Sequence, residues 1–191
     1  MRLFVALDIP ETVRHQLHGL MESLRKVCPG ARWVRPEGIH VTLKFIGHVD
    51  GAKCGAIRRA LERVHSERRV EMRFYGLGFF PNGTRPRVAW CGVEGTPNLA
   101  ELAAEIDQAV ARLGFEREKR AYTPHLTLAR IDAEKVRRGE IEKLVDAAVE
   151  FAGASFGSAS ENEFHLYESV TKSSGAEYKK LQSFAFVKRP A

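Results

Sequence analysis

HVTL at residues 40–43 and HLTL at residues 125–128 are two copies of one pattern, His-x-Thr-Leu, in a chain of 191 residues. With 7 histidines in the chain, chance predicts roughly 0.02 matches to this pattern, so two copies are not an accident of composition. Each copy lies in an apolar stretch typical of a strand, and a helical pattern follows each stretch. The repeat therefore predicts two related halves, 1–94 and 95–191, within a single bilobal domain whose halves exchange strands.

Apolar patterns outside the motifs predict a mixture of helices and strands. LFVALDI at 3–9 is typical of a buried strand, and Pro10 precedes a helical apolar stripe. The segments 70–80 and 85–94 predict two antiparallel strands joined across an Asn-Gly turn. Further helices are expected from about 96 to 113 and from about 132 to 149. Together these patterns predict an α+β, pseudo-duplicated fold in which two antiparallel sheets face a central cleft and the helices lie outside.

Composition and charge narrow the class of protein. The formal net charge is +6 and the pI is about 9.4, which favours polyanionic partners such as nucleic acid. The three cysteines form no close pair, which is typical of reduced thiols and argues against a disulfide framework. No apolar run reaches membrane-spanning length and no export signal is recognisable at the start. We expect a cytoplasmic monomer that does not bind membranes.

Strand alternation gives the motifs a common geometry. Residues i and i+2 of a strand share a face, so His40, Thr42 and Lys44 are expected on one side of the first strand. His125 and Thr127 are expected together on the second strand. The intervening residues should point into the core: Val41, Leu43, Leu126 and Leu128. If the two sheets face each other, two imidazoles and two hydroxyls line one cleft.

Two histidines and two threonines in one cleft suit in-line displacement at phosphorus. The attacking and leaving oxygens lie on opposite sides of the phosphorus, and each needs a proton moved. Imidazole has an ordinary pKa near 6.5, so that one neutral ring and one protonated ring can coexist near neutral pH. The threonine hydroxyls can donate to the non-bridging oxygens. This chemistry requires neither a metal nor a cofactor.

Several alternatives remain at this stage. A single histidine on a strand is usually an ordinary polar residue, and a pair of histidines can also bind a metal, although zinc sites normally use three or four protein ligands. YGLGFF at 75–80 lacks the third glycine of a dinucleotide-binding loop. For Phe45 and Trp33 one alternative is to stack a base, as aromatic residues do in RNA sites. We expect them instead to pack in the lobe, because alternation sends Phe45 to the side opposite His40. The other histidines are expected to be surface or structural: His15, His18, His48, His65 and His165.

WVRPEGIHVTLKFIG at 33–47 and YTPHLTLAR at 122–130 resemble the two-histidine phosphoesterases, specifically the RNA 2′,3′-cyclic phosphodiesterase branch that is also called 2′-5′ RNA ligases. The resemblance spans nearly the whole chain. It implies metal-free hydrolysis of 2′,3′-cyclic phosphate ends to 2′-phosphates. That family pattern implies that His40 and His125 are catalytic and that Thr42 and Thr127 bind the phosphate, with Arg130 and Lys44 as further candidates for phosphate binding. We expect His125 to activate water and His40 to protonate the leaving 3′ oxygen; the pseudo-symmetry of the two motifs leaves the reverse assignment open.

The resemblance implies substrates of RNA or nucleotides with 2′,3′-cyclic phosphate ends. If an RNA 5′-hydroxyl replaces water as the attacking group, the same geometry would join RNA through a 2′-5′ linkage. The alternatives are a phosphodiesterase for 2′-5′ oligonucleotides or small cyclic nucleotides, and a nucleotide- or RNA-binding module without turnover. Simple alternation would place Arg130 on the face opposite His125, so its phosphate role requires a bend at the end of the strand.

Overall fold

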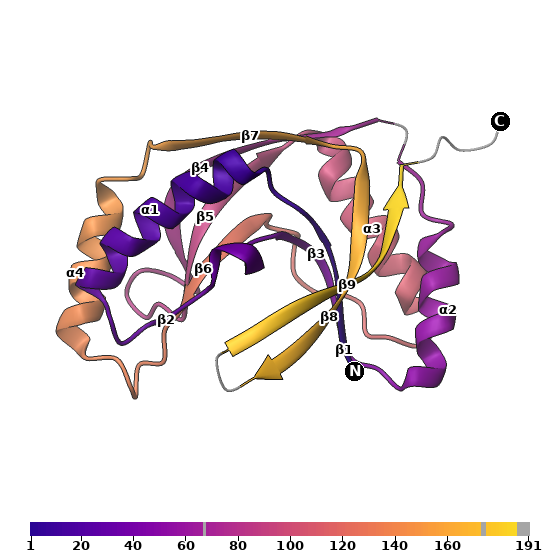
Figure 1. The fold of residues 1–191 in the computed structure, drawn as a ribbon, viewed down its shortest axis with the longest axis horizontal. Coiled ribbons are helices and arrows are strands. Elements are labelled where there is room, and N and C mark those ends of the chain that lie inside the picture. Colours follow the sequence, from indigo (N-terminus) through magenta and orange to yellow (C-terminus); the bar gives the residue numbers. More distant parts are fainter. Residues whose placement is uncertain (67, 173–174, 187–191) are drawn as a thin grey trace.

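The computed structural model describes residues 1–66, 68–172 and 175–186 of the chain (Figure 1). Its helices are α1 (Glu11–Val27), the short 3-10 helix η1 (Pro36–Gly38), α2 (Gly51–Leu61), α3 (Pro97–Ala111) and α4 (Arg138–Val149). Its strands are β1 (Arg2–Leu7), β2 (Arg32–Trp33), β3 (Val41–His48), β4 (Val70–Phe80), β5 (Val88–Gly95), β6 (His125–Arg130), β7 (Ser155–Glu161), β8 (Glu163–Lys172) and β9 (Gly175–Ala185).

The strands form one curled antiparallel sheet in the order β7-β4-β5-β6-β3-β1-β8-β9, with β2 paired to β6. Two groups of four strands make up this order. They meet where β3 pairs with β6, through the single register pair Val41 and Leu126. The expected α+β fold with duplicated halves is confirmed, and the two expected sheets are continuous through this one pair.

Each group of strands draws on both halves of the sequence. β4 and β5 lie beside β6 and β7, whereas β1 and β3 lie beside β8 and β9. Helices α1 and α4 pack against the first group, and α3 packs against β3 of the second with α2 beside it, so the helices cover the outside of the sheet (Figure 1). Because neither half could complete a sheet without strands from the other, we propose that residues 1–191 fold as one domain.

Local sequence explains most element boundaries. The predicted apolar stripe on α1 consists of Val13, Leu17, Leu20, Leu24 and Val27; the first four are buried and Val27 is half-buried. β4 and β5 form the predicted hairpin, and Asn82 Oδ1 accepts the amides of residues 84 and 85 in the connecting turn. The last helix begins at Arg138, later than the predicted 132. The side chain and carbonyl of Asp132 instead accept amides from residues 134 to 136, which forms a turn before the helix.

Strand β1 is buried on both faces. Leu3, Val5 and Leu7 belong to the main core between the sheet and the helices. Phe4 and Ala6 belong to a second, smaller cluster with Tyr167 on the opposite side of the sheet. We call this opposite side, which faces away from the helices, the inner face. The near-continuous apolar run of β1 therefore reflects burial against two different layers.

Candidate active site

The two His-x-Thr motifs meet at the joint between the two strand groups. Val41 pairs with Leu126 and both side chains are fully buried in the main core. Alternation along the strands then sends His40, Thr42, His125 and Thr127 to the inner face. In the register set by the Val41–Leu126 pair, His40 and His125 are diagonal neighbours, for which Cα separations of about 7–8 Å are typical. The sheet thus brings together the four side chains that the sequence selected.

His40 is held by its backbone and by aromatic neighbours. Its Nδ1 lies 2.7 Å from the carbonyl oxygen of Gly38. Its ring stacks on Phe4 at a centroid distance of 4.7 Å and meets Tyr178 edge-on at 5.1 Å. Because a carbonyl only accepts hydrogen bonds, Nδ1 carries the proton of the neutral ring. Nε2 is therefore the nitrogen of His40 left for proton transfer.

His125 is held in the same way. Its Nδ1 lies 2.8 Å from the carbonyl oxygen of Thr123, again two residues earlier in the chain, and Phe80 meets its ring edge-on at 4.9 Å. Phe80 in turn packs on Trp90. The Trp90 ring covers Gly78 so closely that a Cβ there would lie 2.2 Å from it. Gly78 of YGLGFF therefore leaves the space that Trp90 needs to pack against Phe80, which contacts His125.

Burial controls the protonation of both rings. It lowers the pKa of His40 to about 4, although the hydrogen bond to Gly38 and the charge of Asp8 act in the opposite direction. A charge on His125 would lower the pKa of His40 further. Burial also lowers the pKa of His125, and the positive charge of Arg130 adds to this effect. With no substrate bound, both rings are therefore neutral at pH 7.

A β-bulge follows the threonine in both motifs. Against β1, the register skips Leu43, since Ala6 pairs with Thr42 and Val5 with Lys44. Against β5, the register skips Leu128 in the same way. A bulge places two consecutive residues on one side of the strand. Residues beyond each bulge consequently lie on the face opposite to the one that simple alternation predicts.

The prediction that Lys44 shares a face with His40 is wrong because of this bulge. Lys44 is buried on the core side, where its Nζ lies 2.6 Å from Asp107 Oδ1 and donates to the carbonyl of Glu116 at 2.8 Å. Burial alone would raise the pKa of Asp107, but hydrogen bonds from Lys44, the Glu118 amide and Arg117 lower it below its usual value. Lys44 is an anchor for helix α3 and the segment that follows it.

The prediction for Phe45 is also wrong, for the same reason. Its ring is 57% exposed and lies 6.1 Å from the ring of Phe4, which belongs to the inner-face cluster. Phe45 therefore lies on the same side of the sheet as His40. Arg130 occupies the corresponding position after the second bulge and is exposed, so the Leu128 bulge supplies the bend that its predicted role requires.

An acidic residue that the sequence patterns did not single out lies near His40. Asp8, which follows β1, accepts a hydrogen bond from the Tyr167 hydroxyl and one of 2.7 Å from Lys180 Nζ. His165, which was expected to be surface or structural, is 1% exposed; its Nδ1 lies 2.9 Å from Ser183 Oγ, and its Nε2 lies 3.5 Å from Asp8. Alternation along LFVALDI puts Asp8 on the face of Phe4, and this was the available signal.

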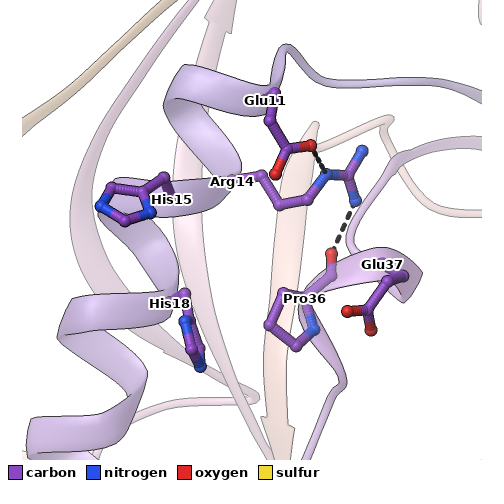
Figure 2. A pocket seen from close by; sticks show the side chains of 6 residues that line it. All are labelled: Glu11, Arg14, His15, His18, Pro36 and Glu37. Carbon is purple, nitrogen blue, oxygen red and sulfur yellow. Dashed lines mark hydrogen bonds and ion pairs between the residues drawn. The ribbon is translucent and has the colours of Figure 1, made fainter.

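Helix α1 positions the segment before His40: Figure 2 shows Arg14 of α1 between Glu11 and the carbonyl of Pro36. The guanidinium of Arg14 donates to the carbonyl of Pro36 at 2.6 Å and to that of Ile9 at 3.2 Å, and it pairs with Glu11. These bonds fix η1, whose Gly38 carbonyl orients His40. A cavity of about 480 Å³ lies beside them, lined by Glu11, Arg14, His15, His18, Pro36 and Glu37. His15 and His18 thus lie on α1 and take no part in the two motifs.

The described part of the chain contains neither a candidate metal site nor a helix that could span a membrane. Within residues 1–66, 68–172 and 175–186, no three His, Cys, Asp or Glu side chains form a group that could hold a metal ion. Across the same residues, no helix combines the length and the apolar character needed to cross a membrane.

Comparisons with known proteins agree with this geometry. A family model described as LigT like Phosphoesterase matches residues 7–90 and 93–178. The chain is 34% identical over 184 residues to the RNA 2′,3′-cyclic phosphodiesterase of Archaeoglobus fulgidus, covering 96% of this chain and 99% of that protein. It is 33% identical over 187 residues to the protein of the same name from Methanocaldococcus jannaschii, covering 96% and 100%.

Solved structures share the fold of this chain over nearly its whole length. A crystal structure from Thermus thermophilus superposes with a TM-score of 0.78 at 27% identity, covering 97% of this chain and 98% of that chain. E. coli LigT complexed with 3′-AMP superposes with a TM-score of 0.75 at 25% identity, covering 98% of each chain. The match extends over both strand groups.

Proposed function

The chain belongs to the family of LigT-like phosphoesterases, and from this premise we propose that it hydrolyses the 2′,3′-cyclic phosphate ends of RNA to 2′-phosphates. The observation that carries the proposal is the pairing of Val41 with Leu126. Because these two side chains point into the core, the neighbouring histidines and threonines of both motifs point to the other face of the sheet. Relatives that carry the name RNA 2′,3′-cyclic phosphodiesterase cover nearly the whole chain, which supports the same substrate class.

In the proposed mechanism the two histidines move one proton each. Nε2 of His125 accepts a proton from water, and the water oxygen attacks phosphorus. Nε2 of His40 donates a proton to the 3′ oxygen as the bond between phosphorus and that oxygen breaks. The product carries a 2′-phosphate and a free 3′-hydroxyl. Thr42 and Thr127 donate to the non-bridging oxygens, and Arg130 offsets the charge that develops on them.

Asp8 is the neighbouring charge that supports this division of roles. Burial lowers the pKa of both rings and keeps His40 neutral in the free enzyme. Asp8 favours the protonated form of His40 against the opposing charge of Arg14, whereas Arg130 disfavours the protonated form of His125. A bound cyclic phosphate brings a negative charge to both rings, and the ring beside Asp8 is then the one that takes the proton.

Ligation is part of the same proposal. An RNA 5′-hydroxyl in place of water would form a 2′-5′ linkage through the same two proton transfers. We further propose that the enzyme acts as a cytoplasmic monomer. The proposed mechanism does not require a second copy of the chain, and the free thiols of Cys28, Cys54 and Cys91 are typical of a reducing compartment.

Incubation of the protein with adenosine 2′,3′-cyclic phosphate in excess EDTA is expected to yield adenosine 2′-phosphate. Product position is read by chromatography against the 2′- and 3′-phosphate standards. Binding without turnover would favour the binding module, and turnover confined to 2′-5′ oligonucleotides would favour the alternative phosphodiesterase. Activity that EDTA abolishes would contradict the metal-free mechanism.

The pH profile is expected to be bell-shaped with its kcat/KM maximum below pH 6.5. The profile of kcat/KM reports the free enzyme, in which the pKa values of both histidines lie below their ordinary value. The profile of kcat reports the complex, in which the substrate phosphate raises both pKa values, so its maximum is expected at higher pH. Steady-state kinetics between about pH 4 and 9 checks both statements. Coincident maxima, or a kcat maximum at lower pH, would contradict them.

A further inference from the structure

A cationic cavity lies at the far end of β6. It has a volume of about 260 Å³ and is lined by Gly30, Arg32, Arg130, Ile131, Asp132 and Lys135. Strand β2 pairs with β6 so that Arg32 is directly opposite Arg130. Side chains of directly opposed residues share a face of the sheet, and like charges in this position are unfavourable. The fold therefore brings two guanidinium groups together at a cost in stability.

No acid in the described part of the chain forms an ion pair with either Arg32 or Arg130. The acid of the cavity is Asp132, whose carboxylate pairs with Lys135 Nζ at 3.2 Å and accepts the amide of Glu134 at 3.2 Å. Asp132 also attracts Arg32, and the carboxylate of Glu140 accepts the amide of Gly30 at the edge of the cavity at 3.0 Å. Three cations thus face two carboxylates, which leaves one positive charge in excess. An anion bound between the two guanidinium groups would remove the repulsion between them.

Strand β6 links the cavity to the proposed active site, because it carries His125 and Thr127 at one end and Arg130 at the other. Thr127 lies on the inner face, the Leu128 bulge follows, and Arg130 comes next on that face. Thr127 pairs with Trp90 and Arg130 with Val88, so the bulge leaves only two strand steps of about 3.3 Å between them. The backbone positions of Thr127 and Arg130 are therefore roughly 7 Å apart. Burial is the main cause of the lowered pKa of His125, and the charge of Arg130 adds to it, so Arg130 lies within electrostatic reach of that ring. A single nucleotide can bridge this distance.

We propose that Arg32, together with Arg130, binds the internal phosphodiester on the 5′ side of the terminal nucleoside, so that the preferred substrate is an RNA 3′ end and not a free cyclic mononucleotide. This inference rests on the proposed function. Two planar guanidinium forks match the oxygens of a phosphodiester better than two ammonium groups would. Arg130, with five donors, contacts this phosphate and the scissile one, whereas Arg32 serves the internal phosphate alone.

Three substrates distinguish the contribution of the internal phosphate to kcat/KM from the contribution of the second base. They are adenosine 2′,3′-cyclic phosphate, the same compound with a 5′-phosphate, and the dinucleotide ApA with a 2′,3′-cyclic phosphate end. Each is tested with the unchanged protein, with Arg32→Gln, and with Arg59→Gln as a control of equal charge change. Arg59 is an exposed residue of α2, which packs on α3 over the other strand group.

We expect Arg32→Gln to lower kcat/KM about tenfold for the two substrates that carry the additional phosphate, mainly through KM. For adenosine 2′,3′-cyclic phosphate the change should be less than about twofold, and Arg59→Gln should leave all three values unchanged. The slope of log(kcat/KM) against log[salt] for the dinucleotide should also become shallower by about 0.7 in Arg32→Gln. An equal loss on all three substrates, or no loss on any, would overturn the proposal.

A binding measurement separates this inference from the proposed function. Calorimetry compares the 3′-phosphorylated dinucleotide ApAp with adenosine 3′-phosphate on the same three proteins. If none of the cyclic substrates is hydrolysed, the proposed function is wrong, and the internal-phosphate site is then judged by this titration. Arg32→Gln should remove the preference for ApAp over adenosine 3′-phosphate. An unchanged preference would overturn the site whatever the outcome for catalysis.

Discussion

Replacing His125 with alanine is expected to lower kcat/KM for adenosine 2′,3′-cyclic phosphate at least ~10²-fold, and His40→Ala is expected to have an effect of the same order. Each change removes the nitrogen that accepts or donates the proton, while the Nδ1 side of the ring contacts only a backbone carbonyl. Steady-state kinetics on variants with an unchanged circular dichroism spectrum measures the loss. His48→Ala is the matched control, because His48 lies at the exposed end of β3.

The double variant His40→Ala/His125→Ala tests whether the two rings act as a unit. If they do, removing the second ring costs little more than removing the first, because either loss already abolishes concerted proton transfer. We expect the double variant to retain activity close to that of the weaker single variant. Turnover within about tenfold of the unchanged protein in either single variant would rule out the two-histidine mechanism.

Lys44→Met is expected to lower the free energy of unfolding by about 3 kcal/mol, because it leaves the Asp107 carboxylate buried without its closest cation. Arg117 still reaches Asp107 at 3.1 Å, which limits the loss. Activity per folded molecule should change little, since Lys44 lies on the core side of the sheet. Urea denaturation and kinetics at low temperature measure the two quantities separately.

Two further variants make this second prediction specific. Lys143→Met, at an exposed position of α4, controls for the loss of a positive charge and should change stability by less than about 0.5 kcal/mol. Lys44→Met/Asp107→Leu removes both charges and should recover most of the stability lost in Lys44→Met. A raised KM with unchanged stability in Lys44→Met would instead restore the phosphate-binding role that the resemblance implied.

The sequence predicted the central feature of the site because that feature depends on local alternation. Val41 and Leu126 point into the core by the period of a strand, and this period fixes where the neighbouring histidines point. The duplication of the motif identified which histidines to choose. The helix stripe of α1 and the turn at Asn82 were predictable for the same reason, since each depends on residues close together in the chain.

The errors have a common physical cause. A β-bulge requires no particular residue at Leu43, so nothing in the sequence marks the point at which alternation changes sides. Lys44 and Phe45 were both assigned to the wrong face as a result. Asp8 was missed for a different reason: its hydrogen-bond partner Lys180 is 172 positions away. Alternation could have predicted the face of Asp8, but its contact with Lys180 becomes visible only when the topology of the sheet is known.

The exchange of strands between the halves determines when the sheet can form during translation. β1 lies between β3 and β8, so the strand that carries Phe4 lacks one neighbour until residues 163–172 have left the ribosome. Until then its open edge is a site for mispairing with other nascent chains. Folding of the His40 region is therefore completed late in translation, even though His40 itself is made early.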